Sequence, residues 1–246
     1  MSNPPMYGNL VPLDRTQHAK LKLSTDKSSL DRIQGLNSLF LAVAEFSDAC
    51  KEFPVVFVRV GAAAEGQRQA IAPLAVFGLK QGSNLFVKDN QWTARYLPAY
   101  VRRYPFAMAR MDDGDSMVLC VDGAWDGLSE AAGAPLFDDK GEASELLLNA
   151  KNFCEEFERE ADRTRQACEI LQDLNLLQDM RFEATLPNGE KLDVDGFMTI
   201  NEKALAELPD AKVVELHRNG LLELITMHRL SLGHMSRLAT QYQAQN

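Results

Sequence analysis

Residues 73–110 read PLAVFGLKQGSNLFVKDNQWTARYLPAYVRRYPFAMAR and contain the densest run of aromatic side chains in the chain. The first part, 73–79, is a short apolar run that closes around a glycine, as a buried strand does. Residues 85–87 are apolar again, and the polar Lys-Asp-Asn sequence that follows suits a hairpin turn. Strand-favouring residues resume at 92–97, until Pro98 removes a backbone donor and ends regular pairing. The stretch therefore predicts short strands joined by tight turns.

Two adjacent arginines, Arg102 and Arg103, follow among aromatic and apolar residues. Arginine is rarely buried without a partner, so their setting needs an explanation. In one interpretation, the guanidinium groups pair with internal acids or stack on tyrosines. In the other, at least one guanidinium binds an anionic ligand, because its planar fork fits a carboxylate or a phosphate. The side chains that would form this arginine–aromatic groove are Trp92, Tyr96, Tyr100, Arg102, Arg103 and Tyr104, with Asn84 at the preceding turn.

Composition limits the classes of function. A chain of 246 residues holds one large domain or two small ones, and its 46% apolar and 25% charged content is ordinary for a soluble globular protein. A net charge of −9 argues against general nucleic-acid binding and against docking on anionic lipid. The N-terminus lacks the features of a signal peptide, and no apolar run approaches the ~20 residues of a membrane span. We expect a soluble, cytoplasmic protein without membrane insertion.

The cysteines show no metal-ligand pattern. Cys50, Cys120, Cys154 and Cys168 have neither CxxC nor Cys/His spacing, so reduced thiols are expected. No cofactor is predicted, and a transition metal is left as an open alternative. The acidic segment 111–115 lacks the ligand pattern of a calcium loop and is expected to be a hairpin turn.

The first part of the chain predicts a sheet. Alternation over 17–23 indicates a first strand, opened by His18. Apolar spacing over 36–52 indicates a helix. The remaining predictions for this part are strands at 55–60 and 116–122 and a loop at 61–72.

The last third predicts helices around a hairpin. Residues 142–178 form one long amphipathic helix or a broken pair. Asn188-Gly189 between two alternating runs is a strong hairpin signal, near 181–198. Further helices are predicted at 201–208, 210–218 and 221–242. We therefore expect an α+β fold, with a mixed β-sheet in residues 1–140 and a helical, hairpin-containing region in 141–246 packed on it. These two regions form either two domains or one continuous domain.

Several motifs follow one another over nearly the whole chain. They are YGNLVPL at 7–13, His18, FPVVF at 53–57, Gly78-Leu79, NLFV at 84–87, Trp92, YLPA at 96–99, RRYPF at 102–106 and LFDD at 136–139. In these motifs the chain resembles the bacterial SapC family, which takes its name from a surface-layer secretion locus. The resemblance implies an accessory protein associated with surface-layer or peptide secretion and uptake systems, and it brings no established catalytic residues.

Three functional hypotheses follow. In the first, a non-enzymatic accessory protein binds a peptide or another anionic small ligand in the arginine–aromatic groove, so that binding weakens with salt and is lost in Arg102→Ala or Arg103→Ala. In the second, an enzyme tailors a peptide or amino acid, with a metal or acid/base group among His18, Glu45 and Asp122. In the third, a scaffold binds a partner protein through the helices at 142–178 or 221–242.

Overall fold

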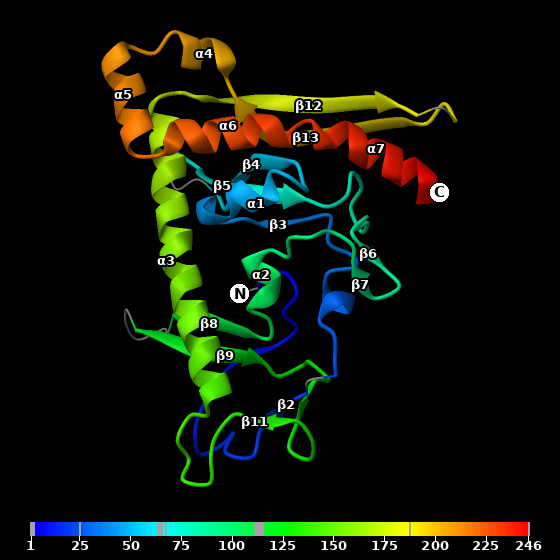
Figure 1. The fold of residues 1–246 in the computed structure, drawn as a ribbon, viewed down its shortest axis with the longest axis vertical. Helices are drawn as coiled ribbons and strands as arrows, with labels where there is room; N and C mark the ends of the chain where they lie inside the picture. Colours follow the sequence, from blue (N-terminus) through cyan, green and yellow to red (C-terminus); the bar gives the residue numbers. More distant parts are fainter. Residues whose placement is uncertain are drawn as a thin grey trace. The chain divides into compact units, whose positions relative to one another are not determined.

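The computed structural model describes residues 3–24, 26–62, 66, 68–110, 116–186 and 188–245. The chain has the expected α+β fold, and its described strands pair antiparallel (Figure 1). It divides into two compact units, each built from two stretches of sequence. Unit 1 comprises residues 1–33 and 100–159, and unit 2 comprises residues 34–99 and 160–246. The predicted domain boundary at residue 140 stays a prediction, because the two units are defined by their internal contacts and not as separate domains.

Unit 1 contains two small sheets and the first part of the long helix α3. Phe106, Val121 and Leu136 are central to its core, which the apolar faces of β8 and β9 fill from one side. The elements are β1 (Leu10–Pro12), β9 (Met117–Asp122) and β8 (Phe106–Arg110) in one sheet, β10 (Leu128–Ser129), β2 (Lys22–Leu23) and β11 (Ala134–Pro135) in the other, with η1 (Leu30–Arg32), α2 (Ala99–Arg102) and α3 (Glu145–Asp173).

Unit 2 is built on a five-stranded sheet. Its strand order is β12-β13-β4-β5-β3, so the predicted hairpin extends the sheet by pairing β13 with β4. The strands are β12 (Leu177–Thr185), β13 (Lys191–Ile200), β4 (Val55–Val60), β5 (Ala70–Val76) and β3 (Ser38–Phe40). A separate hairpin joins β6 (Val87–Lys88) to β7 (Gln91–Trp92) through Asp89 and Asn90, whose φ angles of 50° and 55° are typical of a tight hairpin turn.

Helices cover the sheet of unit 2. Figure 1 shows α6 and α7 running along it, and α6 packs on β4 and β13. Gly220, with a φ of 80°, allows the chain to turn from α5 into α6. The helices are η2 (Val43–Glu45), α1 (Phe46–Ala49), α4 (Glu202–Ala206), α5 (Asp210–Arg218), α6 (Leu221–Ser231) and α7 (His234–Gln245). None of the described helices combines the length and apolar character that a membrane crossing requires.

The sequence predictions for β4, β9, α3, the β12–β13 hairpin, α4 and α5 are confirmed. The helix expected over 36–52 is wrong in its first half, because β3 pairs with β5 and only the following residues turn into η2 and α1. The loop expected over 61–72 ends early, since Ala70 already pairs with Val60 in the sheet. The helix expected over 221–242 is divided at Gly233, a residue that weakens helices.

The strand expected over 17–23 is also wrong in its first half. The carboxylate of Asp14 accepts hydrogen bonds from the backbone N–H groups of Thr16 and Gln17, at 2.8 Å each. This local capping holds the segment in turns, and only Lys22 and Leu23 form a strand. The expected turn at 111–115 lies outside the described residues, although β8 and β9 on either side of it pair as a hairpin would.

Gly78 is required by a close approach between two loops of unit 2. Its N–H donates to the carbonyl of Asn37 at 3.1 Å, and a Cβ placed on it would lie 2.0 Å from the backbone oxygen of Ser83. We expect Gly78→Ala to lower the free energy of unfolding by about 2 kcal/mol or more, because backbone must move to admit the methyl group. Urea unfolding measures this loss. Gly35→Ala, where a Cβ meets nothing within 4 Å, is the matched control, and an equal loss in both variants would contradict the expectation.

Candidate functional site

Arg103 is enclosed by aromatic rings in unit 1. Its guanidinium carbon lies 4.1 Å from the ring centre of Phe157 and 4.3 Å from that of Tyr100. Its Nη1 donates to a carboxylate oxygen of Glu158 at 3.3 Å, and only 7% of the Arg103 side chain is exposed. These contacts are an internal acid and aromatic faces, the partners named in the first interpretation of this arginine.

Arg102 has different surroundings, although it directly precedes Arg103 as the last residue of α2. Its side chain is exposed, and its guanidinium lies 5.1 Å from the ring centre of Phe153 on α3. The adjacent Tyr100 is buried and donates its hydroxyl hydrogen to the carbonyl of Pro5 at 3.2 Å. Of the two arginines, Arg102 is therefore the one that solvent and solutes can reach.

Asp122 is fully buried and lies at the centre of a hydrogen-bond network. Its carboxylate accepts hydrogen bonds from the N–H groups of Gly8, Asn9 and Ala124, at 3.0, 2.8 and 3.2 Å. The hydroxyl of Tyr104 adds a fourth, at 2.8 Å. Burial by itself raises the pKa of Asp122, but these hydrogen bonds outweigh it and the pKa is lowered. Asp122 is therefore an ionised anchor that ties the N-terminal segment to β9, and burial raises the pKa of Tyr104 beside it.

Glu45 plays the corresponding role in unit 2. It is 7% exposed, and one of its oxygens accepts hydrogen bonds from the Tyr96 hydroxyl and the Ala99 N–H, both at 2.7 Å. Its other oxygen accepts from the N–H of Ala42 at 3.0 Å. The carboxylate thereby holds the segment that follows β7 against the start of η2, and it fixes the ring of Tyr96.

An aromatic cluster in unit 2 carries the remaining predicted residues. Trp92 packs against Phe53, Phe77 and Phe86, with ring centres 5.4 to 5.8 Å apart. Its indole N–H donates to the carbonyl of Tyr96 at 2.7 Å. Asn84 is buried, and its side-chain oxygen accepts a hydrogen bond from the N–H of Phe86 at 2.9 Å, which shapes the turn before β6.

The predicted residues therefore fall into two groups. Tyr100, Arg102, Arg103 and Tyr104 belong to unit 1, whereas Asn84, Trp92 and Tyr96 belong to unit 2, so the arginine–aromatic groove as one site stays a prediction. His18 accepts a hydrogen bond from the N–H of Asp14 at 3.0 Å within a turn. No group of three or more His, Cys, Asp or Glu side chains within the described ranges is arranged to hold a metal ion.

An open pocket of about 700 Å³ in unit 2 brings charged side chains around Tyr96. Two arginines line it, Arg95 from the segment after β7 and Arg237 from α7. In the part of the chain that the structure describes, neither guanidinium has a carboxylate partner or a hydrogen bond. The other residues of this pocket are Asp48, Lys51 and Glu52.

The arginines of three other pockets in unit 2 all have carboxylate partners. These pairs are Arg163 with Glu160 at 2.8 Å, Arg165 with Glu169 at 2.8 Å, Arg68 with Asp173 at 3.0 Å and Arg181 with Glu183 at 3.0 Å. Arg95 and Arg237 differ from them because, among the described residues, neither forms an ion pair, although Asp48 and Glu52 line the same pocket. Of these four pockets, it is therefore the one best suited to an anion.

Comparison with models of protein families assigns the chain to one family. The sequence model described as SapC matches residues 13–238. This chain belongs to the SapC family. Comparison with curated proteins and with solved structures found no match.

Residues of the sequence motifs at 7–13, 96–99 and 102–106 surround the two buried carboxylates. Gly8 and Asn9 of the YGNLVPL motif and Tyr104 of the RRYPF motif all donate to Asp122. Tyr96 and Ala99 of the YLPA motif both donate to Glu45. In this SapC chain, those motifs therefore build the scaffold of each unit.

Sequence reasoning missed Arg95 and Arg237 as candidates. Arg95 lies within residues 73–110, next to Tyr96, but it has no second arginine beside it and resembles an ordinary surface residue. Arg237 belongs to a distant part of the sequence, and only the packing of α7 brings it to the same pocket. No signal in one sequence links two such residues.

Proposed function

We propose that this SapC protein is a binding protein, and that the pocket formed by Arg95, Tyr96 and Arg237 recognises the anionic group of a small ligand or peptide. The observation that carries the proposal is a pair of arginines in one pocket that have no carboxylate partner among the residues described in the structure. A guanidinium binds carboxylate or phosphate through two parallel hydrogen bonds, and hydrogen bonds to charged groups contribute about 1.5–3 kcal/mol each.

The surroundings of the pocket suit such recognition. The hydroxyl of Tyr96 donates a hydrogen bond to Glu45, which fixes the orientation of the ring, so that the pocket has one preorganised aromatic side. The volume of about 700 Å³ falls within the range of small-molecule sites. Arg103, by contrast, already has Glu158 and two aromatic rings as partners, and a ligand at that residue would compete with them.

The family association with surface-layer or peptide secretion and uptake systems adds a context for this function. A binding protein in such a system would meet peptides, whose terminal carboxylate is the anion that an arginine pair fits. Recognition of a peptide carboxylate therefore agrees with both the pocket and the family.

The proposal is tested on the arginine side chains themselves. Nε–Hε signals of nitrogen-15-labelled protein, assigned with Arg→Lys variants, are followed while potassium acetate or inorganic phosphate is added. We expect the signals of Arg95 and Arg237 to shift and saturate together, and Arg237→Ala to weaken the response of Arg95 by about tenfold or more.

Arg165 provides the internal control, because it lines another pocket and is paired with Glu169 at 2.8 Å. Its signal should move little. Equal, unsaturable shifts of Arg95, Arg237 and Arg165 would mean that anions only screen the surface, and the proposal would then be abandoned.

A further inference from the structure

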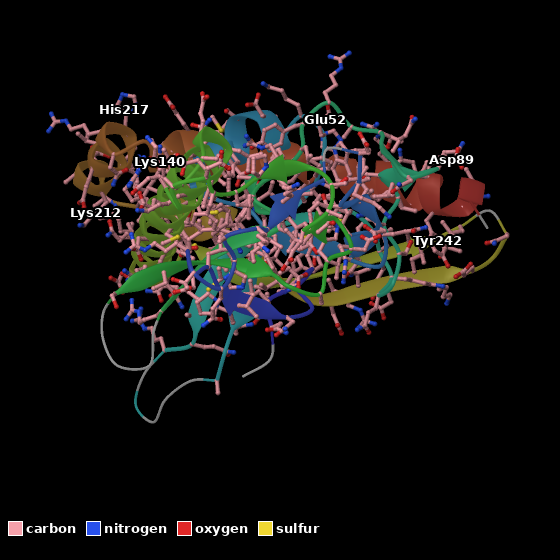
Figure 2. The ribbon with its side chains drawn as sticks, turned by 90° about the horizontal axis from the view of Figure 1, so that it is seen from below. Glu52, Asp89, Lys140, Lys212, His217 and Tyr242 are labelled. Atoms are coloured by element: carbon pink, nitrogen blue, oxygen red, sulfur yellow. The ribbon has the colours of Figure 1, made fainter. Side chains whose placement is uncertain are left out.

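The same pocket contains an acid, Glu52, that pairs with no cation of the described ranges. Glu52 lines the pocket and is half-buried, and Figure 2 shows it near the outer edge of that view. Lys51 does not pair with it, because its ammonium group binds Asp48 at 2.9 Å. Considering only residues that the structure describes, the Glu52 carboxylate has no ion pair or hydrogen bond. The pocket therefore offers two uncompensated positive charges and one uncompensated negative charge.

The three charged residues are held by one framework. Phe53, next to Glu52, packs on Trp92 with ring centres 5.8 Å apart, and Trp92 donates to the carbonyl of Tyr96 beside Arg95. On α7, the Nε2–H of His234 donates to the carbonyl of Cys50 at 3.1 Å, which fixes the helix that carries Arg237. The positions of the positive and negative groups are thus set by the same packed elements of unit 2.

An uncompensated carboxylate selects among anionic ligands. It repels a ligand that carries only negative charge, and it attracts one that also carries a cation at the matching position. A free α-ammonium group and a free α-carboxylate are the two charges of an amino acid or an unmodified short peptide. The cavity volume favours a peptide of a few residues over a lone anion.

We propose that the ligand is a short peptide with both termini free, whose carboxylate binds Arg95 and Arg237 and whose ammonium group binds Glu52. This inference rests on the proposed function, because it assigns the class of ligand to the same pocket. Glu52 acts as the specificity-determining residue, since it distinguishes a zwitterionic peptide from one with a blocked N-terminus.

Three forms of one probe test the inference by titration calorimetry: trialanine, N-acetyl-trialanine and trialanine amide. We expect trialanine to bind at least about tenfold more tightly than either blocked form. In Glu52→Gln, the affinity for trialanine should fall to that for N-acetyl-trialanine, while the affinity for the acetylated form stays the same or rises. Glu207→Gln, an exposed glutamate outside this pocket, is the matched control and should preserve the wild-type order.

The possible failures are distinct. Equal binding of trialanine and N-acetyl-trialanine, or an unchanged ratio in Glu52→Gln, would overturn the role of Glu52 and leave the anion site intact. If no tripeptide binds while acetate still saturates the Arg95 signal, the ligand class is wrong and the anion site stands. If acetate and phosphate also fail to saturate that signal, the proposed function falls together with this inference.

Discussion

Asp122→Ala is expected to lower the free energy of unfolding by about 2–4 kcal/mol, because it removes an ionised acceptor that four donors share. The variant removes a carboxylate that is 0% exposed and leaves four donors, one of them the buried hydroxyl of Tyr104, without their acceptor. All four donors are backbone N–H groups or the hydroxyl of Tyr104, and this hydroxyl is buried, so solvent replaces its lost acceptor poorly. Urea unfolding followed by circular dichroism measures the loss.

Asp122→Asn separates the contribution of shape from that of charge. The amide keeps the volume and one acceptor oxygen, so it should recover part of the stability and remain below the wild type. A loss below about 1 kcal/mol in Asp122→Ala would contradict the structural role and would return Asp122 to the candidates for chemistry.

The stability of unit 2 is expected to fall as the pH drops from 6.5 to about 4 because of His228. This side chain is 0% exposed, its Nδ1–H donates to the carbonyl of Val55 at 2.8 Å, and its Nε2 accepts from the N–H of Ile200 at 3.2 Å. Burial lowers the pKa of His228 from 6.5 to about 4. Over this interval the unfolded chain binds a proton that the folded chain refuses, so stability is full above pH 6.5 and is lost below it, by about 3 kcal/mol in total.

His228→Gln removes the titrating group and tests this directly. The difference in unfolding free energy between wild type and variant should shrink from pH 7 to pH 4, because only the wild type loses the histidine contribution. His217→Gln is the control, since His217 lies exposed on α5 at the edge of Figure 2. A wild-type pH profile parallel to that of His228→Gln would show that His228 does not titrate in this way.

The elements that the sequence predicted correctly have a hydrophobic pattern that matches the period of a helix or of a strand, but not of both. The β-branched run of β4 and the long apolar stripe of α3 fit a single structure. The segment 36–52 fits two structures, because a few apolar residues at close spacing suit either a helix or a strand. Its first part becomes a strand because β5 is available to pair with β3. A one-sequence reading cannot supply that partner.

The candidate site shows the same limit at the level of single side chains. The RRYPF motif marks two arginines equally, yet the fold buries Arg103 against Phe157 and leaves Arg102 exposed. Glu45 and Asp122 were predicted as possible chemical groups, and their hydrogen bonds to backbone explain why acids occur at these buried positions. Arg95 and Arg237 lack any local signal, because what distinguishes them is that no carboxylate of the described residues pairs with them in the folded chain.

The most direct measurement of the central claim is the affinity for trialanine of three proteins: wild type, the double variant Arg95→Ala/Arg237→Ala, and Arg102→Ala. Titration calorimetry is performed at low and at physiological salt. We expect binding to the wild type that weakens with salt, an unchanged affinity in Arg102→Ala, and no measurable binding to the double variant. Binding that persists in the double variant and disappears in Arg102→Ala would contradict this account and would place the site at the arginine–aromatic residues of unit 1.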